Sequence, residues 1–347
     1  MHRDRPRRAA TVRGRGGALL APGLVLALVA LGVAALASVA VGAKSIAPGV
    51  VLDSLLHYDP ANADHLVVRT MRVQRTEVGM LAGLALGLAG AIMQGVTRNP
   101  LADPGIVGVN AGAALFVVAG ISLFGVTTLT GYVWFGFAGA AVTSVVVYAI
   151  GALGRDGATP VKLALSGAAV SAALGSLTTA LLLTDNDAFE RFRLWQVGSL
   201  AGRDGTLVTQ ALPFVAVGVL LALPCGRLLN VLSLGDDMAR ALGQHVAAGR
   251  ALAAASVVVL CGTATALAGP IGFIGLTVPL VARMITGPDH RWILPYSTVL
   301  APTLLLVADV VGRVVARPAE VQVGIVTAAI GAPIFVVLVR RRHLAEL

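Results

Sequence analysis

Long apolar runs recur along almost the whole chain, and they constrain its fold more than any other feature. Ten such runs begin near residues 18, 77, 106, 131, 161, 207, 251, 277, 293 and 323. A helix crosses the bilayer core with about 20 apolar residues, and it satisfies its own backbone hydrogen bonds there. The runs therefore predict an all-α, polytopic membrane protein of about ten transmembrane helices.

The composition agrees with a membrane protein and excludes several other classes. Charged residues make up 12% of the 347 residues, about half the share found in soluble globular proteins. That share is too small for the surface of a soluble enzyme, for a disordered chain or for a nucleic-acid-binding domain. Aromatic residues make up only 5%, whereas there are 41 glycines, which favours closely packed helices over a β-barrel with aromatic girdles.

The distribution of charge predicts the orientation of the helices. Residues 1–17 form a basic tail, residues 18–339 the membrane domain and residues 340–347 a second tail, and an even number of spans places both tails on one side. That side carries 17 of the 26 Lys and Arg residues but only 7 of the 17 acids. Because positive residues accumulate on cytoplasmic loops, we expect both termini in the cytoplasm. A signal peptide is the alternative reading of the first run, which is longer than the apolar part of such a peptide.

The cytoplasmic segment 226–250 is predicted to form short amphipathic helices. Ser233 to Asp236 carry a helix-capping pattern, Asp236 and Asp237 stand at the positive end of the helix, and Gly243 can end it. From the residues alone, its apolar stripe fits a groove of a soluble partner and the membrane surface equally well. The stripe consists of Leu232, Leu234, Met238, Ala241 and Leu242.

Proline and glycine mark three special stretches within the apolar runs. Residues 97–112 are expected to form a turn between spans, and residues 268–279 cannot be one continuous helix. Irregular backbone at membrane depth is tolerated inside protein or along a cavity, as in transporters, although 268–279 could instead be an interfacial turn. Glycines at 79, 83 and 87 let a neighbouring helix approach closely, either at the centre of the bundle or in ordinary packing.

Groups that could carry chemistry are scarce. The chain has two lysines and no phosphate-binding loop, its six histidines lack ligand spacing, and no catalytic or metal-binding constellation is present. We therefore expect no enzyme activity, no metal and no cofactor bound by this chain. The few carboxylates near the spans, such as Asp309, also argue against an ion-coupled transporter, so energy is expected to come from elsewhere.

Three arginines at span ends face outwards in the predicted topology, against the usual charge bias. Arg72, Arg75 and Arg313 therefore need a specific reason to lie there. Their forked donors could bind phosphate headgroups or paired carboxylates on an external partner.

Taken together, these motifs resemble the FecCD-type permeases of ABC importers, over about residues 44–340 in the same order and spacing. Residues 101–113 and 194–200 look most like the ferric-enterobactin type within that family. The resemblance is carried by Arg72 and Arg75, by Gly83, Gly87, Gly90 and Gln94, by Asn99, Pro100, Leu101, Ala102, Asp103 and Pro104, by Gly269, Gly272, Gly275 and Pro279, and by Asp309 and Glu320.

The resemblance implies the type II importer fold and the transport of a ferric siderophore across the cytoplasmic membrane of a bacterium. Haem or cobalamin is the alternative cargo in the same family, and an ion-coupled secondary transporter is the alternative of another class. The implied partners are a second permease subunit, identical or related, two ATP-binding subunits that hold the ATP, an extracytoplasmic binding protein and the lipid bilayer, with no nucleic acid.

The resemblance also implies roles for particular residues. Arg72, Arg75 and Arg313 fall where the family engages acidic residues of the binding protein. The fifth and tenth spans, near residues 161–183 and 323–339, fall where the family lines its pore. The segment that would dock the ATPase includes Leu234, Gly235, Asp236, Asp237, Ala241, Leu242 and Gly243.

Overall fold

Ten apolar helices account for the ten apolar runs. The computed structural model describes residues 16–340 apart from 127, 154–158 and 204, and these described residues form helices and no strand. The long helices are α1 (Gly16–Ala40), α4 (Gln74–Thr97), α6 (Leu129–Gly151), α7 (Pro160–Thr184), α9 (Gly205–Ala222), α12 (Val246–Ala268) and α14 (His290–Val315). The shorter apolar helices are α5 (Val109–Phe124), α13 (Ile274–Thr286) and α15 (Val323–Arg340). The predicted fold class is confirmed, whereas the predicted tails lie almost wholly outside the described residues.

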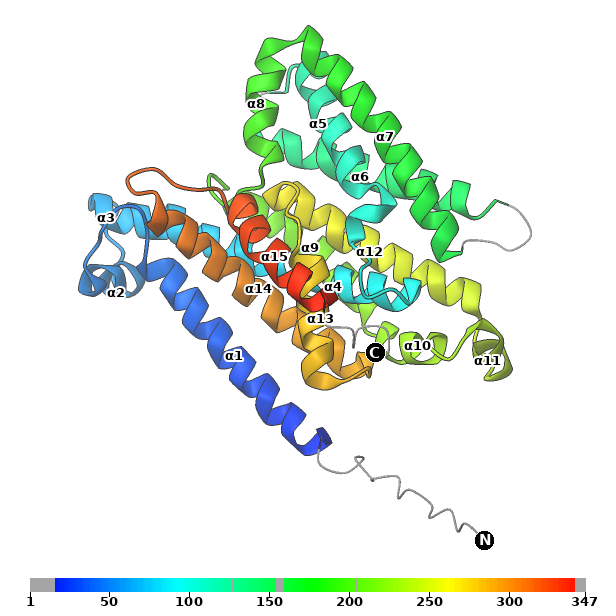
Figure 1. The fold of residues 1–347 in the computed structure, drawn as a ribbon. Helices are drawn as coiled ribbons and strands as arrows, with labels where there is room; N and C mark the ends of the chain where they lie inside the picture. The colour runs from blue at the N-terminus through cyan, green and yellow to red at the C-terminus, as the bar shows by residue number, and fades with distance from the viewer. Residues whose placement is uncertain (1–15, 127, 154–158, 204, 341–347) are drawn as a thin grey trace.

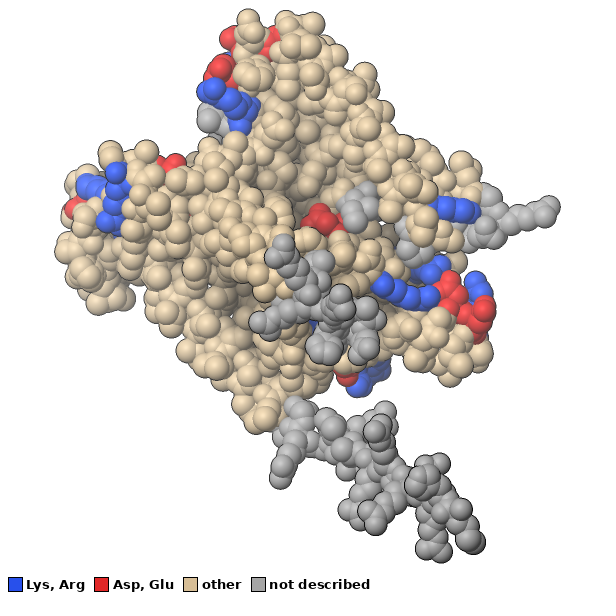
Figure 2. Space-filling model, in the orientation of Figure 1, with Lys and Arg blue, Asp and Glu red and all other residues tan. Residues whose placement is uncertain are grey.

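Short helices mark the two ends of the bundle. Helices α2 (Pro48–Leu56), α3 (Ala63–Leu66) and α8 (Asn186–Gln196) lie at one end, and α10 (Cys225–Leu232) and α11 (Asp236–Ala241) lie at the other (Figure 1). Most charged side chains on this face gather near these ends, and the band between them is largely uncharged apart from an acidic patch near its centre (Figure 2). Helix α1 begins, and α15 ends, on the side of α10 and α11. We name the two ends the outer and the inner end, after the charge-based prediction.

Helix α4 forms the centre of the bundle. In its most apolar stretch 83% of the residues are buried, and it packs against α14, α12, α13 and α9. A Cβ atom on Gly83 would lie 2.7 Å from the backbone nitrogen of Pro302, and one on Gly87 would lie 2.6 Å from Cβ of Ala301. The glycine stripe therefore lets α14 approach α4 closely. Of the two alternatives for these glycines, the structure favours the helix at the centre of the bundle over ordinary packing.

The helical backbone leading into α4 starts earlier than the apolar run near residue 77. It begins with α3 and continues through the π-helical segment η1 (Val67–Val73). Val68 is fully buried beside Ile46 and Val51, so a small apolar cluster stabilises this outer extension. The polar segment between the first two spans is thus folded.

Helix α7 lies at the periphery. Only 11% of its most apolar stretch is buried, and it packs mainly against α5 and α6, with α8 at its outer end (Figure 1). Most of the apolar and small side chains of α7 are therefore left uncovered by this chain, in contrast to those of α4.

Candidate functional site: two polar ends and the path between them

At the inner end, one carboxylate ties α11 to two spans. Arg98, which caps the end of α4, and Arg250, in the first turns of α12, both donate to Oδ1 of Asp236, the second from 3.0 Å. Burial alone would raise the pKa of Asp236, but the hydrogen bonds and charges of the two arginines outweigh it and lower that pKa. Helix α11 is thereby coupled to α4 and α12, although Asp237 beside it is fully exposed.

The ends of α11 agree with the sequence in part. Gly243 has a φ of 80°, its N–H donates to the Arg240 carbonyl (2.9 Å), and the next N–H donates to the Ala239 carbonyl (3.0 Å), so it ends the helix as predicted. The predicted capping by Ser233 is wrong, because its hydroxyl donates to the Asn230 carbonyl (2.7 Å) and Gly235 occupies the N-cap position without a side-chain bond.

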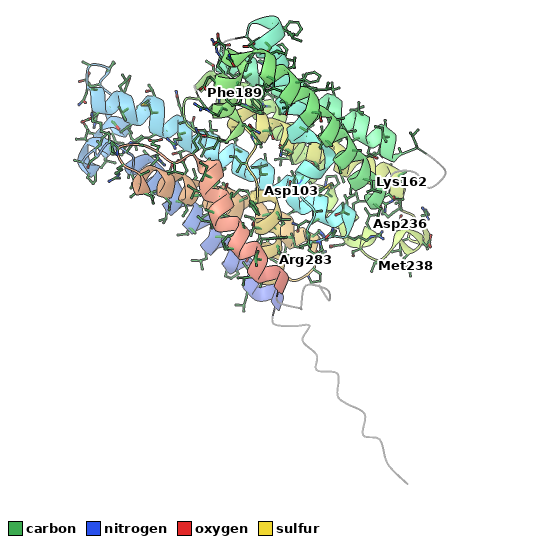
Figure 3. The ribbon with its side chains drawn as sticks, turned by 45° about the horizontal axis from the view of Figure 1, so that its top comes forward. Asp103, Lys162, Phe189, Asp236, Met238 and Arg283 are labelled. Carbon is green, nitrogen blue, oxygen red and sulfur yellow. The ribbon has the colours of Figure 1, made fainter. Side chains whose placement is uncertain are left out.

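The apolar stripe of this segment divides into two parts. Leu232 is buried against the bundle, whereas the side chains of Leu234, Met238 and Leu242 are each more than half exposed. Figure 3 shows Met238 beside Asp236 at the inner end. We name Leu234, Met238 and Leu242 the inner apolar patch, which no described residue covers.

The two motif stretches of the sequence meet in space. Oδ1 of Asn99 accepts from the N–H of Leu101 (2.9 Å), and Oδ1 of Asp103 accepts from that of Gly105 (2.7 Å), so both side chains shape the turn after α4. Burial raises the pKa of the Asp103 carboxyl. Gly275 lies so close to Pro104 that an added Cβ would be 3.1 Å from its Cδ, which joins the turn to the start of α13.

The helix break at 268–273 is partly enclosed in protein, since Ala268, Gly269 and Ile271 are buried whereas Gly272 is exposed. Helix α12 ends at Ala268 and is followed by Gly269, whose φ of 75° suits glycine, and the N–H of Ser199 donates to the Ala268 carbonyl (2.7 Å). The N–H of Gly324, at the start of α15, donates to the Gly198 carbonyl (3.2 Å). The loop between α8 and α9 thus satisfies the last carbonyl of α12, and Pro270 of the break lines a cavity, which favours the transporter-type break over an interfacial turn.

A cavity of about 620 Å³ lies next to this break, between α5, α7 and α8. Of the described residues that line it, none is charged; they are apolar, aromatic, hydroxyl and amide side chains. Figure 3 shows Phe189 towards the outer end and Asp103 between α7 and α15. The cavity is lined by Asn110, Thr178, Thr179, Phe189, Phe192, Trp195, Gln196 and Pro270, among others.

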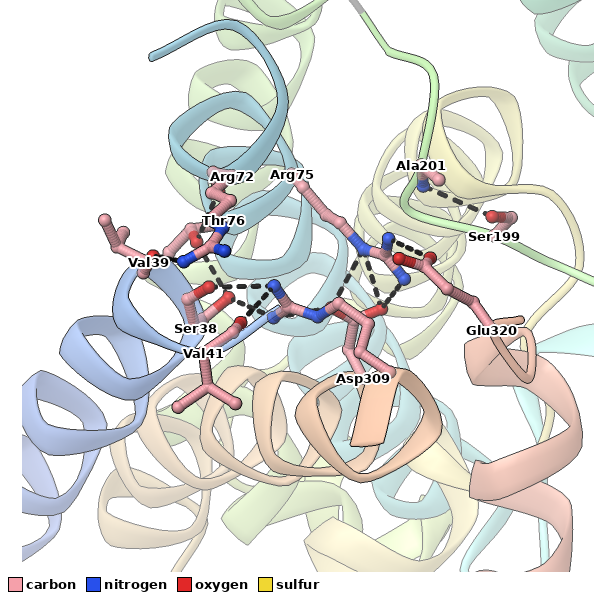
Figure 4. A network of polar contacts seen from close by, with 11 residues as sticks. Ser38, Val39, Val41, Arg72, Arg75, Thr76, Ser199, Ala201, Asp309 and Glu320 are labelled. Carbon is pink, nitrogen blue, oxygen red and sulfur yellow. Dashed lines mark hydrogen bonds and ion pairs between the residues drawn. The ribbon is translucent and has the colours of Figure 1, made fainter. Parts of the chain in front are cut away.

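At the outer end, Arg75 joins α4 to α14 through a buried ion pair. Its guanidinium donates to Asp309, with Nη2 2.7 Å from Oδ1, and to Oε2 of Glu320 at 2.6 Å (Figure 4). Asp309 is fully buried, and its Oδ2 lies 3.0 Å from Nη2 of Arg313. The Asp309 carboxylate thus offsets part of the positive charge of both Arg75 and Arg313.

The other two arginine contacts cap the end of α1. Arg313 donates to the carbonyls of Ser38 (2.9 Å) and Val41 (2.8 Å), and Arg72 donates to those of Ala40 and Lys44, both at 2.6 Å. The last carbonyls of a helix lack partners within it and carry partial negative charge. Arginine side chains meet both needs, so these contacts fix the first span to the bundle.

These internal partners were not anticipated from the sequence. Arg72, Arg75 and Arg313 stand at span ends as expected, but their exposed fractions are only 4%, 8% and 1%. From the sequence alone, phosphate headgroups and carboxylates of an external partner are the expected ligands of these arginines. The structure adds a third explanation: Arg72 and Arg313 cap α1, and Arg75 and Arg313 pair with Asp309. Docking of a partner on these three residues stays a prediction.

A fourth outer arginine, Arg203, was not singled out from the sequence. It lies in the loop between α8 and α9 and is 5% exposed. It faces the same cavity of about 670 Å³ as the other three arginines, Lys44 and Glu320. The reasoning that selected Arg72 would also have found it, since it too opposes the charge bias.

Comparisons with known proteins point in one direction. The model of the FecCD transport family matches residues 28–341. The chain is 45% identical to the ferric enterobactin transport system permease protein FepD of Escherichia coli over 94% of this chain and 96% of that protein. It is 40% identical to the cobalamin import system permease protein BtuC of Halobacterium salinarum over 84% of this chain and 78% of that protein. A solved structure of an inward-facing metal-chelate type ABC transporter superposes with a TM-score of 0.78 at 28% identity, over 94% of this chain and 99% of that one.

Proposed function

Because the chain belongs to the FecCD transport family, we propose that it is the permease subunit of an ATP-driven importer that moves a ferric siderophore across the cytoplasmic membrane. The observation that carries this proposal is the combination of ten apolar helices with an inner helix that is tied to two of them and has an uncovered apolar face. A chain with these features can form a transport path and can be displaced by a partner at its inner end, but its sequence contains no ATP-binding motif of its own.

We propose that one of the two ATP-binding subunits docks on the inner apolar patch of this chain, and that the other docks on the second permease subunit. An amphipathic helix binds a partner by laying its apolar side chains into a groove. Asp236 then transmits a displacement of α11 to α4 through Arg98 and to α12 through Arg250. Since α4 is the core of the bundle, a shift at the patch reaches the whole permease.

The path of the cargo is proposed to run between two permease subunits along α7 and α15. Support comes from the uncovered face of α7 and from the uncharged cavity beside it. Side chains without charge hold an iron chelate weakly and let it pass, because specificity can reside in a binding protein outside. The second subunit is identical or related, and both termini are placed in the cytoplasm.

The cargo is proposed to be a ferric siderophore because the ferric enterobactin permease matches nearly the whole chain. A cobalamin permease also matches, so haem or cobalamin is the alternative cargo. The test is uptake into proteoliposomes that hold the permease with its ATP-binding subunits, ATP inside and the binding protein outside. We expect accumulation of ferric siderophore and none of haem or cobalamin; accumulation of only one of the latter would contradict the proposal.

A further inference from the structure

A third cavity lies in the inner half of the bundle. It has a volume of about 400 Å³ and lies between the last turns of α4 and α6, the start of α7 and the first half of α12. Further out, α6 and α12 touch, since a Cβ atom on Gly262 would lie 3.4 Å from Cβ of Ala140. Towards the inner end a gap opens between them, and the buried Met93 and Val96 of α4 form its floor. We name this gap the inner groove.

The inner groove is apolar and open to the outside of the bundle. Only 33% of the most apolar stretch of α6 is buried, and Val145 on this wall is 66% exposed. On the opposite wall, Ala255 of α12 is exposed as well. An uncovered apolar face of a membrane-spanning helix is in contact with acyl chains, which are as apolar as the side chains themselves. The polar members of the lining are Thr97, Ser144, Tyr148 and Arg250.

The length of the inner groove matches one leaflet of a bilayer. Its α12 wall runs from Arg250 to Val259, which is about 14 Å of helix at a rise of about 1.5 Å per residue. The hydrocarbon core of a bilayer is about 30 Å thick, so one leaflet contributes about 15 Å. Tyr148 lies near the inner end of α6, as tyrosines do at the level of the lipid headgroups. The groove therefore has the length and polarity to hold one acyl chain.

The inner mouth of the groove carries more positive than negative charge. Arg98 and Arg250 share the carboxylate of Asp236 (Figure 3), and neither has another acidic partner among the described residues. Asp237 does not supply the missing charge, because it is paired with Arg240 at 2.9 Å. Nη2 of Arg250 donates to Asp236 at 3.0 Å, whereas its buried Nε has no acceptor. The Arg250 side chain is 13% exposed, so an anion at the mouth can reach it.

We propose that the inner groove binds an anionic phospholipid of the surrounding leaflet, with one acyl chain between α6 and α12 and the phosphate at Arg250. The forked donors of a guanidinium match the oxygens of a phosphate, and basic pockets between membrane-spanning helices bind anionic headgroups. The bound lipid lies beside the link between α11 and α12, because Asp236 forms that link through the same arginine. The inference goes beyond the proposed function, since it depends on the membrane location of the chain and not on its cargo or partners.

The headgroup is tested by native mass spectrometry of the full-length chain in mixed micelles with equal amounts of phosphatidylglycerol and phosphatidylcholine. We expect the wild type to retain one phosphatidylglycerol per chain in preference to phosphatidylcholine. R250Q should lower this preference about fivefold, because a basic residue at the membrane surface contributes about that much to the binding of an anionic lipid. D236N should raise the preference by a similar factor, because it removes the carboxylate that competes for Arg250. A general loss of structure would not change the two variants in opposite directions.

The acyl chain is tested with two phenylalanine variants. A255F places a ring in the groove from an exposed position and should abolish retention of the single lipid. The matched control is A30F, on an exposed position of α1 outside the groove, which should retain the lipid as the wild type does.

Three results would overturn the inference. They are equal retention of the two lipids by the wild type, a preference that does not fall in R250Q and rise in D236N, or equal retention by A255F and A30F. These results leave the proposed function intact, because ATP-driven uptake of the cargo is measured separately. Failure of that uptake would in turn leave a preference for phosphatidylglycerol unexplained by transport and the lipid site unchanged.

Discussion

Replacement of Arg75 by glutamine should unfold the outer end of the bundle more readily than any exposed substitution there. Asp309 is fully buried and receives three hydrogen bonds from Arg75, with distances of 2.7 to 3.0 Å. Removing one member of a buried ion pair costs about 3–5 kcal/mol, because the remaining charge is left without its partner. Arg313 still contacts Asp309 at 3.0 Å, so we expect the lower limit, about 3 kcal/mol. The bond to Glu320 adds little, since that carboxylate is partly exposed.

The assay is equilibrium unfolding in mixed micelles, applied to R75Q, D309N and the double variant. In the double variant neither an unpaired Asp309 carboxylate nor the Arg75 charge remains, so it should lose about 2 kcal/mol less than the sum of the single variants. The exposed Arg69 provides the control, because among the described residues its guanidinium contacts only the Tyr58 ring, 5.7 Å from the ring centroid, and R69Q should therefore change stability by less than about 1 kcal/mol. Additive losses, or a loss below about 1 kcal/mol in R75Q, would refute the structural role assigned to this pair.

Three further predictions concern the core and the inner end. G83A should lower the thermal midpoint by several degrees, because its Cβ would lie 2.7 Å from the Pro302 nitrogen and overpacking costs about 1–3 kcal/mol, whereas G32A, with no atom within 4 Å, should not. D236N should reduce transport-coupled ATP hydrolysis, and D237N, which changes a fully exposed carboxylate, should leave it unaltered. Since the pKa of Asp236 is lowered on folding, its contribution is present above the unfolded pKa near about 3.9 and is lost only as the pH falls through the folded pKa, so the D236N effect should be constant from about pH 5 to 8. M238E places a charge on the inner apolar patch and should release the ATP-binding subunits on size-exclusion chromatography; unchanged co-elution would count against docking there.

The spans could be predicted from the sequence because lipid imposes a local rule on each of them. A run of about 20 apolar residues has few alternatives to a helix in the bilayer, wherever the rest of the chain lies. The glycine stripe and the helix break at residues 268–279 are equally local, since missing Cβ atoms and proline act on their own segment. The end of α11 at Gly243 could be predicted for the same reason, because the positive φ of a glycine depends on its own backbone.

The polar partners could not be predicted in this way, because they are distant in the chain. Arg75 and Asp309 are 234 residues apart, and Arg313 caps carbonyls 272 and 275 residues away. The sequence shows that these charges are unusual but not which groups satisfy them. Ser233 illustrates the opposite error: the local capping pattern was present, but the preceding turn offered its hydroxyl a carbonyl acceptor at 2.7 Å.

The most direct test of the proposed function is the energy source of uptake by the purified complex. Proteoliposomes would hold the permease with its ATP-binding subunits, and the binding protein loaded with radioactive ferric siderophore would be added outside. We predict accumulation that requires ATP within the vesicles and is unaffected by a protonophore. Uptake that proceeds without ATP and collapses with the protonophore would contradict the account and identify an ion-coupled carrier.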